Sequence, residues 1–278
     1  MKYTRNQFLK LAGMTLGGTV ALPSCASSVA QNIANDTSLN YGLSSYTFRN
    51  FSLDDTIKMT LRLGIKNLSL KSMHMPLESS PAEIKTIAEK VRAAGLNFYG
   101  AGVIYMKTKE EVDNTFAYAA NAGLNMIIGV PNHELLPLVE EKVKSTNIVL
   151  AIHNHGPGDK LYTSPNDVYD KIKGLDKRIG LCIDIGHVQR IGEDPVALLK
   201  KYHERLYDMH MKDVTSSTAD GGPVEIGRGV IDIPGVIRTL KQINYKGNMN
   251  FEFEKDGDDP LPGMSESLGY IRGIAKMT

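Results

Sequence analysis

Hydrophobic positions gather into short runs that alternate with amphipathic segments from about residue 41 to the C-terminus. The short runs have the composition of buried strands, and the segments between them repeat apolar positions at helical spacing. Eight such alternations predict a parallel sheet covered by helices. The expected strands are 41–48, 65–70, 96–102, 125–130, 147–153, 179–184, 205–210 and 247–253. The expected helices are 53–63, 81–94, 109–122, 134–145, 165–173, 194–203, 233–243 and 263–275.

Local sequence at the ends of the helices supports these boundaries. The stretches SPAE (80–83) and TKEE (108–111) are typical capping boxes, and RAAGL (92–96) ends a helix with glycine before the next strand. No change of composition divides the chain after residue 38, and the remaining ~240 residues are close to the ~250 typical of a (β/α)₈ barrel. The sequence therefore predicts one TIM-barrel domain over residues 39–278.

The N-terminus has a different character. Basic residues precede a short apolar run, which predicts an export signal over residues 1–25, and the small, polar residues 26–38 are typical of a linker. The stretch TRNQFLK resembles a twin-arginine signal with Asn6 in place of the second arginine. LPSC resembles a lipobox, in which Cys25 would carry the lipid; the alternative is a cleaved leader with an incidental cysteine. We expect an exported protein, periplasmic or attached to the membrane through a lipidated Cys25.

Composition limits the classes of partner. The chain has 278 residues and a formal net charge of +1, so its charge gives no reason to expect a nucleic-acid partner. After the leader, no apolar run reaches the roughly 18–20 residues that span a bilayer. The two cysteines, Cys25 and Cys182, do not form a disulfide framework.

Polar side chains are expected on the inner face of the last strand. Side chains alternate between the two faces of a strand. If Phe251 and Phe253 face the helices, then Asn250, Glu252 and Glu254 face the barrel interior. Carboxylates in a core are costly unless something pairs with them.

The same alternation turns polar side chains inward on the three preceding strands. They lie at the C-terminal strand ends, where barrel enzymes assemble their sites. His153, Asp184, His210 and Glu252 are separated by 31, 26 and 42 residues, which places them on consecutive strands. The full inward set on these three strands is His153 and His155, then Cys182 and Asp184, then Asp208, His210 and Lys212.

Two imidazoles and two carboxylates together suit a divalent metal. The set fits Mn²⁺, Fe²⁺, Co²⁺, Ni²⁺ or Zn²⁺ better than Mg²⁺. For any one of the four residues alone, a hydrogen-bonded core histidine or a salt-bridged acid would be the simpler interpretation. Their shared position at four strand ends favours one metal ion bound by His153, Asp184, His210 and Glu252.

Four stretches, LCIDIGH, DMHMKD, GRGVID and NFEFEKD, resemble the xylose-isomerase-like TIM-barrel family in their order and spacing. Members hold one divalent metal with a glutamate, an aspartate, a histidine and a second glutamate. The resemblance implies that Asp184, His210 and Glu252 are ligands and that His153 stands where the family has its first glutamate. The HNH stretch at 153–155 is closer to the HHH-type stretch of inosose dehydratases.

The resemblance also implies a chemistry. Members remove a proton next to a carbonyl of a sugar and form a metal-stabilised enediolate. Reprotonation gives an isomerase or epimerase, whereas loss of a β-substituent gives a dehydratase or a 3-keto-glycoside lyase. Because the chain is expected to be exported, we expect a small free, oxidised or glycosidic sugar rather than a sugar phosphate.

The remaining polar residues near the strand ends are candidates for proton transfer or substrate binding. The candidate bases are His155, Glu254, His187 and His74. For His155 and Glu254 the alternative role is orientation of a metal ligand, and Glu252 would also transfer protons. The candidate substrate contacts are His74, Lys71, His187, Arg228 and Lys212, with an ordinary rim or turn position as the alternative.

Two other functions fit the same barrel. The leader and the missing glutamate are compatible with a non-catalytic sugar-binding lipoprotein. An abasic-site endonuclease would need more metal ligands and a basic groove, and both the net charge and the leader argue against it.

Overall fold

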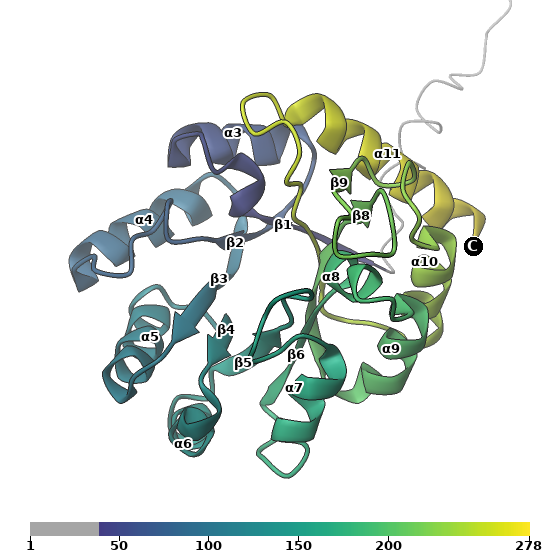
Figure 1. The fold of residues 1–278 in the computed structure, drawn as a ribbon. Helices are drawn as coiled ribbons and strands as arrows, with labels where there is room; N and C mark the ends of the chain where they lie inside the picture. Colours follow the sequence, from purple (N-terminus) through teal and green to yellow (C-terminus); the bar gives the residue numbers. More distant parts are fainter. Residues whose placement is uncertain (1–38) are drawn as a thin grey trace, which may run out of the picture. The chain divides into compact units, whose positions relative to one another are not determined.

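The computed structural model describes residues 39–278, and the predicted leader and linker lie outside the described residues. Eight parallel strands close into a barrel in the order β1-β10-β7-β6-β5-β4-β3-β2 (Figure 1). The predicted (β/α)₈ TIM barrel is therefore confirmed for this part of the chain. Within residues 39–278 we find no helix that combines the length and apolar character needed to cross a bilayer.

The barrel strands lie close to the expected positions. They are β1 (Asn40–Ser44), β2 (Asn67–Leu70), β3 (Asn97–Met106), β4 (Met126–Pro131), β5 (Val149–His153), β6 (Ile179–Asp184), β7 (Leu206–Met211) and β10 (Asn248–Phe251). A separate antiparallel pair, β8 (Asp213–Val214) and β9 (Pro223–Val224), lies in the segment that follows β7.

Helices surround the barrel (Figure 1). The α-helices are α3 (Leu53–Arg62), α4 (Pro81–Ala93), α5 (Lys109–Asn121), α6 (Leu136–Thr146), α7 (Pro165–Ile172), α8 (Ile185–Arg190), α9 (Pro195–Tyr202), α10 (Ile233–Gln242) and α11 (Leu261–Met277). The part of the chain that the structure describes also contains the short 3₁₀ helices η1 (Ser45–Phe48), η2 (His133–Leu135) and η3 (His203–Arg205).

Local chemistry sets the ends of these helices as expected. Ser80 and Thr108 each form a complete capping box, with Glu83 and Glu111 as the returning side chains. Each box satisfies backbone N–H groups that would otherwise lack a partner at the start of the helix. The helices that begin at these boxes, α4 and α5, lie outside the barrel on either side of β3 (Figure 1).

Several elements differ from the sequence expectation. Strand β3, expected at 96–102, continues to Met106. The first expected strand, 41–48, ends at Ser44, and η1 follows it. The last expected strand, 247–253, ends at Phe251, so Glu252 and Glu254 lie in the loop after β10. The short helix α8 was not expected; Asp184 caps it by accepting a hydrogen bond from the backbone N–H of His187 at 2.9 Å.

Strand register brings the polar strand ends together. Asn250 on β10 is level with His210 on β7, which is level with Asp184 on β6. His153 on β5 is level with Cys182 on β6. Because neighbouring strands lie only about 4.8 Å apart, side chains at these levels meet inside the barrel.

Candidate active site

Four buried side chains converge at the carboxyl rim of the barrel. His153 ends β5, Asp184 ends β6, His210 lies near the end of β7, and Glu252 follows β10. One potential ligand atom from each lies within 4.8 Å of all the others. The structure thus brings together the four residues that the sequence placed on consecutive strands, and we call them the four-residue cluster.

The atoms of the cluster face a common point. His210 Nδ1 lies 3.0 Å from Glu252 Oε2, 3.1 Å from His153 Nε2 and 3.7 Å from Asp184 Oδ2. Asp184 Oδ2 is fully buried and also lies 3.5 Å from His153 Nε2. Its closest cation is the Lys212 ammonium group at 3.0 Å, an ion pair rather than a hydrogen bond of good geometry. Two nitrogens and two carboxylate oxygens in this arrangement fit a divalent transition metal such as zinc or manganese.

Each carboxylate presents one oxygen to the cluster while a protein group orients the other. Asp184 Oδ1 accepts from the His187 backbone, and Glu252 Oε1 accepts from the Ser44 hydroxyl at 3.0 Å. Burial would raise the pKa of both acids, but the nearby imidazoles and the Lys212 ammonium hold each pKa well below its usual value. Both side chains are therefore ionised, as metal ligands must be.

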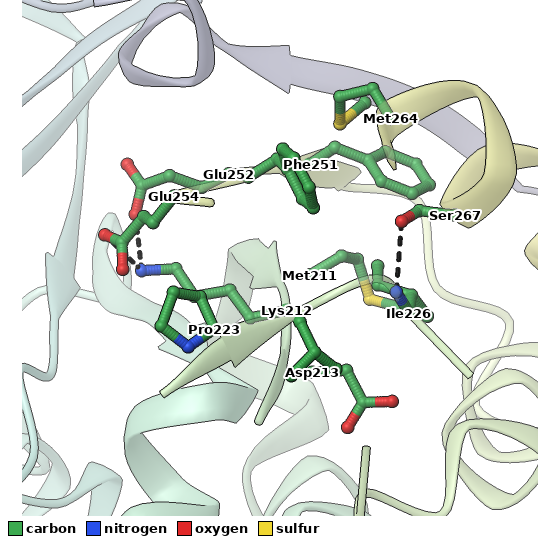
Figure 2. Close-up of a pocket in the computed structure, with 12 residues that line it drawn as sticks. Met211, Lys212, Asp213, Pro223, Ile226, Phe251, Glu252, Glu254, Met264 and Ser267 are labelled. Atoms are coloured by element: carbon green, nitrogen blue, oxygen red, sulfur yellow. Dashed lines mark hydrogen bonds and ion pairs between the residues drawn. The ribbon is translucent and has the colours of Figure 1, made fainter. Parts of the chain in front are cut away.

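Lys212 lies among three carboxylates. Its Nζ is 3.0 Å from Asp184 Oδ2, 2.8 Å from Glu252 Oε2 and 2.9 Å from Glu254 Oε1. Figure 2 shows this ammonium group directed at the two glutamates. Burial would lower the pKa of Lys212, but the three carboxylates raise it well above its usual value. Lys212, which the sequence predicted as a substrate contact, therefore balances the negative charge of these three carboxylates.

His153, the histidine of the cluster that ends β5, is suited to bind a metal as a neutral ligand. Burial lowers the pKa of His153 well below its usual value, so that the imidazole is uncharged at neutral pH. Cys182 could form an alternative group with His153 and His210. Burial raises the pKa of the Cys182 thiol to about 12, which favours the two carboxylates as the ionised ligands.

His155 lies beside the cluster on the loop after β5. Its ring is stacked on Tyr105 at a centroid distance of 5.3 Å, and its Nε2 is 3.0 Å from the Tyr105 hydroxyl. Its ring also meets the ring of His153 in an edge-type contact, with the ring centroids 4.5 Å apart. Burial, with a smaller effect from His187, lowers the pKa of His155 to about 4. A neutral imidazole in this position is able to accept a proton.

Three further predicted residues border the cluster. His187 lies on α8, with Nε2 3.9 Å from Asp184 Oδ2, and its buried Nδ1 has no hydrogen-bond partner among the described residues. Lys71 follows β2 and lies over the ring of Tyr46 at 5.4 Å. Burial lowers the pKa of Lys71, while the negative charges of Glu252 and Glu254 oppose this shift. Glu254 itself is one-third exposed and held by Lys212.

His74 and Arg228 are placed differently from the others. Both ring nitrogens of His74 are engaged by the protein: Nε2 lies 3.0 Å from the Phe51 carbonyl, and Nδ1 lies 2.9 Å from the Ser45 hydroxyl. Arg228 is exposed, and its guanidinium makes two hydrogen bonds with Glu266 on α11. The structure gives His74 a packing role and Arg228 a surface ion pair, and brings neither into the cluster.

Sequence reasoning did not single out Tyr105, Ser44 or Tyr99. Tyr105 and Ser44 lie at the ends of β3 and β1, so strand-end position was the signal that could have found them. Tyr99 lies inside the barrel, where its hydroxyl is 3.2 Å from Asp208 Oδ2. Burial raises the pKa of Asp208 to about 7, and Asn250 also donates to this carboxyl.

The family model described as the xylose isomerase-like TIM barrel matches residues 133–274, just over half the chain and all four residues of the cluster. The chain belongs to this family. An inosose dehydratase of Klebsiella pneumoniae is 33% identical over 147 residues, which are 45% of this chain and 48% of that protein. The rhizopine catabolism protein MocC of Rhizobium meliloti is 26% identical over 152 residues, 49% of this chain and 46% of that one. The chain thus spans about half the length of these curated relatives.

Solved structures of other proteins have the same barrel. An uncharacterised protein of Parabacteroides distasonis has 26% identity and a TM-score of 0.67, and the match covers 84% of this chain and 98% of that one. The IOLI protein with a bound zinc atom has a TM-score of 0.71 at 13% identity, covering 86% and 99%. At that identity the second match supports the fold alone.

Proposed function

We propose that this protein is a divalent-metal-dependent enzyme that removes a proton from the carbon next to a carbonyl group of a keto-sugar or keto-cyclitol. The observation that carries the proposal is the convergence of His153, Asp184, His210 and Glu252 within 4.8 Å at the carboxyl rim. That rim is where barrel enzymes perform their chemistry. Membership of the xylose isomerase-like family supports the same reaction class.

Each polar residue has a role in this proposal. The four-residue cluster would hold the metal, which when bound acts as a Lewis acid on the substrate carbonyl. His155 is neutral near pH 7 and accepts the α-proton, while the Tyr105 hydroxyl orients its ring. Lys212 holds Glu254 and Glu252 in place, and its charge favours negative charge that develops on the substrate.

The fate of the deprotonated substrate determines the class of enzyme. Reprotonation would give an isomerase or epimerase, which the family resemblance suggested first. Elimination would give a dehydratase or a 3-keto-glycoside lyase. An imidazole at position 153 leaves the cluster without one of the family's two glutamates, and curated relatives include inosose dehydratases. These two observations favour elimination as the second candidate function.

Proton NMR in D₂O with aldoses, ketoses, keto-cyclitols and 3-keto-glycosides tests the proposal. We expect exchange of the α-proton that EDTA abolishes and Mn²⁺ or Zn²⁺ restores, and the same spectra identify an isomer or an elimination product. A variant with His210→Ala and Glu252→Ala is expected to lose exchange, while the surface control Arg228→Ala keeps it. Exchange that persists in the double variant, or sugar binding without exchange in the wild type, would contradict the enzymatic proposal.

We also propose that the protein is exported and attached to a membrane through Cys25. The proposal rests on the basic and apolar leader of residues 1–25 and on the LPSC stretch. Labelling with radioactive palmitate in a bacterial host is expected to mark the full chain in the membrane fraction and to fail for Cys25→Ala. Equal labelling of the two proteins would exclude lipidation at this cysteine.

A further inference from the structure

A surface groove lies at the carboxyl rim beside the four-residue cluster. It is formed by the β2–α4 loop, the end of β3 and the first turns of α5, and its volume is about 300 Å³. Leu77 and Glu78 line it from the loop, Tyr105 from β3, and Asn114 from α5. These elements neighbour one another on one side of the barrel (Figure 1).

Tyr105 connects this groove to the candidate active site. Its side chain lines the groove, and its hydroxyl lies 3.0 Å from Nε2 of His155, the candidate base. The rings of Tyr105 and His155 stack at 5.3 Å, and His155 in turn approaches His153 of the cluster at 4.5 Å. A molecule bound at the cluster could therefore extend past Tyr105 into the groove.

The lining combines apolar surface with unoccupied hydrogen-bond acceptors. Leu77 is 43% exposed and Tyr105 is 42% exposed, which is high for residues of this size. Neither the Glu78 carboxylate nor the Asn114 amide makes a hydrogen bond within the described residues. The Glu111 carboxylate is different, because it already accepts from the backbone N–H of Thr108 at 3.1 Å.

These features match a neutral sugar ring. A pyranose has apolar C–H faces that pack on aromatic and aliphatic side chains, and its hydroxyl groups donate hydrogen bonds to carboxylate and amide oxygens. The ionisable groups that line the groove are two glutamates and two tyrosines, and no lining residue carries a positive charge. An anionic ligand such as a sugar phosphate is therefore disfavoured.

We propose that the groove is a second subsite, which binds the non-reacting ring of a disaccharide while the keto-sugar ring occupies the four-residue cluster. This inference rests on the proposed function, because it assigns the reacting ring to that site. Binding of a remote part of a substrate contributes to the rate of the chemical step when it positions the reacting ring. The substrate class is then a keto-disaccharide rather than a free keto-sugar.

A double variant with Leu77→Ala and Asn114→Ala tests the subsite. Both residues are exposed and lie outside the four-residue cluster. A matched control replaces Asn121, an exposed asparagine at the other end of α5, and Met277, an 81% exposed residue at the C-terminus, with alanine. The substrates are 3-keto-cellobiose and 3-keto-maltose, compared with methyl 3-keto-β-glucoside.

We expect kcat/KM for α-proton exchange to fall by about tenfold with at least one keto-disaccharide in the groove variant, the loss expected for one hydrogen bond and one apolar contact. With the methyl glucoside, kcat/KM should stay within about twofold of wild type, and the control variant should be unchanged with every substrate. Equal losses for the large and small substrates, or no loss for either, would overturn the subsite.

Binding separates failure of the subsite from failure of the proposed function. Saturation-transfer NMR with unoxidised cellobiose and maltose requires no turnover. If the wild-type protein catalyses no exchange with any substrate, the proposed function fails, and this binding measurement alone decides about the groove. A weaker signal in the groove variant than in the control supports the subsite, and equal signals in the two variants refute it.

Discussion

Lys212 illustrates how a buried charge depends on its neighbours. Its ammonium group lies within 3.0 Å of carboxylate oxygens from Asp184, Glu252 and Glu254. Removing one partner of a buried ionic group leaves the others uncompensated, which costs more than the original interaction contributed. In the absence of a metal, Lys212 is therefore important for stability as well as for the proposed chemistry.

Replacement of Lys212 by methionine is expected to lower the free energy of unfolding of the EDTA-treated protein by about 3–5 kcal/mol. A divalent metal should recover part of the loss, because it neutralises the same carboxylates. Urea unfolding with and without Zn²⁺ measures both effects. Lys255→Met is the control, since Lys255 pairs with Glu225 at a partly exposed position and should cost at most about 1 kcal/mol. Equal losses for the two variants would contradict this role of Lys212.

His74 shows that a histidine near a strand end can be structural. Its ring is buried and bonded to Ser45 and Phe51, and burial lowers its pKa. In the unfolded chain the same group has the ordinary histidine pKa of about 6.5. Below that pH the unfolded state binds more protons than the folded state. The stabilisation by neutral His74 is therefore complete above pH 6.5 and is lost as the pH falls toward the folded pKa.

We expect His74→Gln to reduce the free energy of unfolding by about 1–3 kcal/mol at pH 7.5, because two buried hydrogen bonds are disturbed. The difference from wild type should become smaller between pH 6.5 and pH 5, since the wild type loses stability there through protonation of His74. Urea unfolding of both proteins at several pH values measures the difference. A difference that grows as the pH falls would show that the sign of this argument is wrong.

At the level of single residues, sequence reasoning succeeded where backbone geometry alone sets the direction of a side chain. Strand alternation correctly turned His153, Asp184 and His210 toward the barrel interior. It could not place His74 or Arg228, because the loops after a strand have no such periodicity. Their partners, Ser45 and Glu266, are distant in sequence and are identified only by the fold.

The loop after β5 positions two histidines of the site. Gly156 follows His155 directly and has a φ of +72°, which non-glycine residues rarely adopt. A Cβ atom at this position would lie 2.9 Å from both the Cβ and the carbonyl oxygen of His187. Gly158, two residues later, also has a positive φ, of +88°, but a Cβ atom there would contact nothing within 4 Å.

Alanine variants of these two glycines form a matched pair that tests whether the positions of His155 and His187 matter for the proposed activity. Both Gly156→Ala and Gly158→Ala introduce backbone strain, which costs about 1 kcal/mol. Only Gly156→Ala should also displace His155 and His187, and we expect it to lower kcat for α-proton exchange at least tenfold. Gly158→Ala should keep kcat within about twofold. Comparable kcat values for the two variants would argue against a role for these histidines.

At the level of elements, the sequence patterns predicted the longer helices accurately but missed a short one. The capping boxes at Ser80 and Thr108 marked the starts of α4 and α5 because capping is a local interaction. Helix α8 has only six residues, too few for a helical period to show, and it depends on the side chain of Asp184 as its cap. The end of β10 depends on pairing with β7, which no local pattern specifies.

At the scale of the whole barrel, the candidate active site depends on correct closure. Strand β1 pairs with β10, so Asn40 is level with Asn248, and Ser44 from β1 reaches Glu252 after β10. Eight strand–helix alternations were sufficient to predict a closed barrel. The sequence patterns did not predict the shifts of register between β6 and β7 or between β3 and β4. Register depends on how neighbouring strands pair around the closed barrel, which no local pattern specifies.

Because the four residues of the cluster lie at or just after the ends of four different strands, a metal bound by them should stabilise the folded protein as a whole. A ligand that binds only the folded state, at 100 times its dissociation constant, adds about 2.7 kcal/mol to the free energy of unfolding. We expect Tm of the EDTA-treated protein to rise by several degrees with Zn²⁺ or Mn²⁺. A Tm that responds equally in a variant with His210→Ala and Glu252→Ala would place the effect elsewhere.

The most direct test of the central claim is the metal content of the purified protein. Wild-type protein is stripped with EDTA, equilibrated with Zn²⁺ or Mn²⁺, freed of loose metal by dialysis, and analysed by inductively coupled plasma mass spectrometry. The four-residue cluster predicts one bound ion per chain in the wild type, the same in Cys182→Ala, and almost none in the variant with His210→Ala and Glu252→Ala. A wild-type protein that retains neither metal, or a double variant that retains as much as the wild type, would contradict the account.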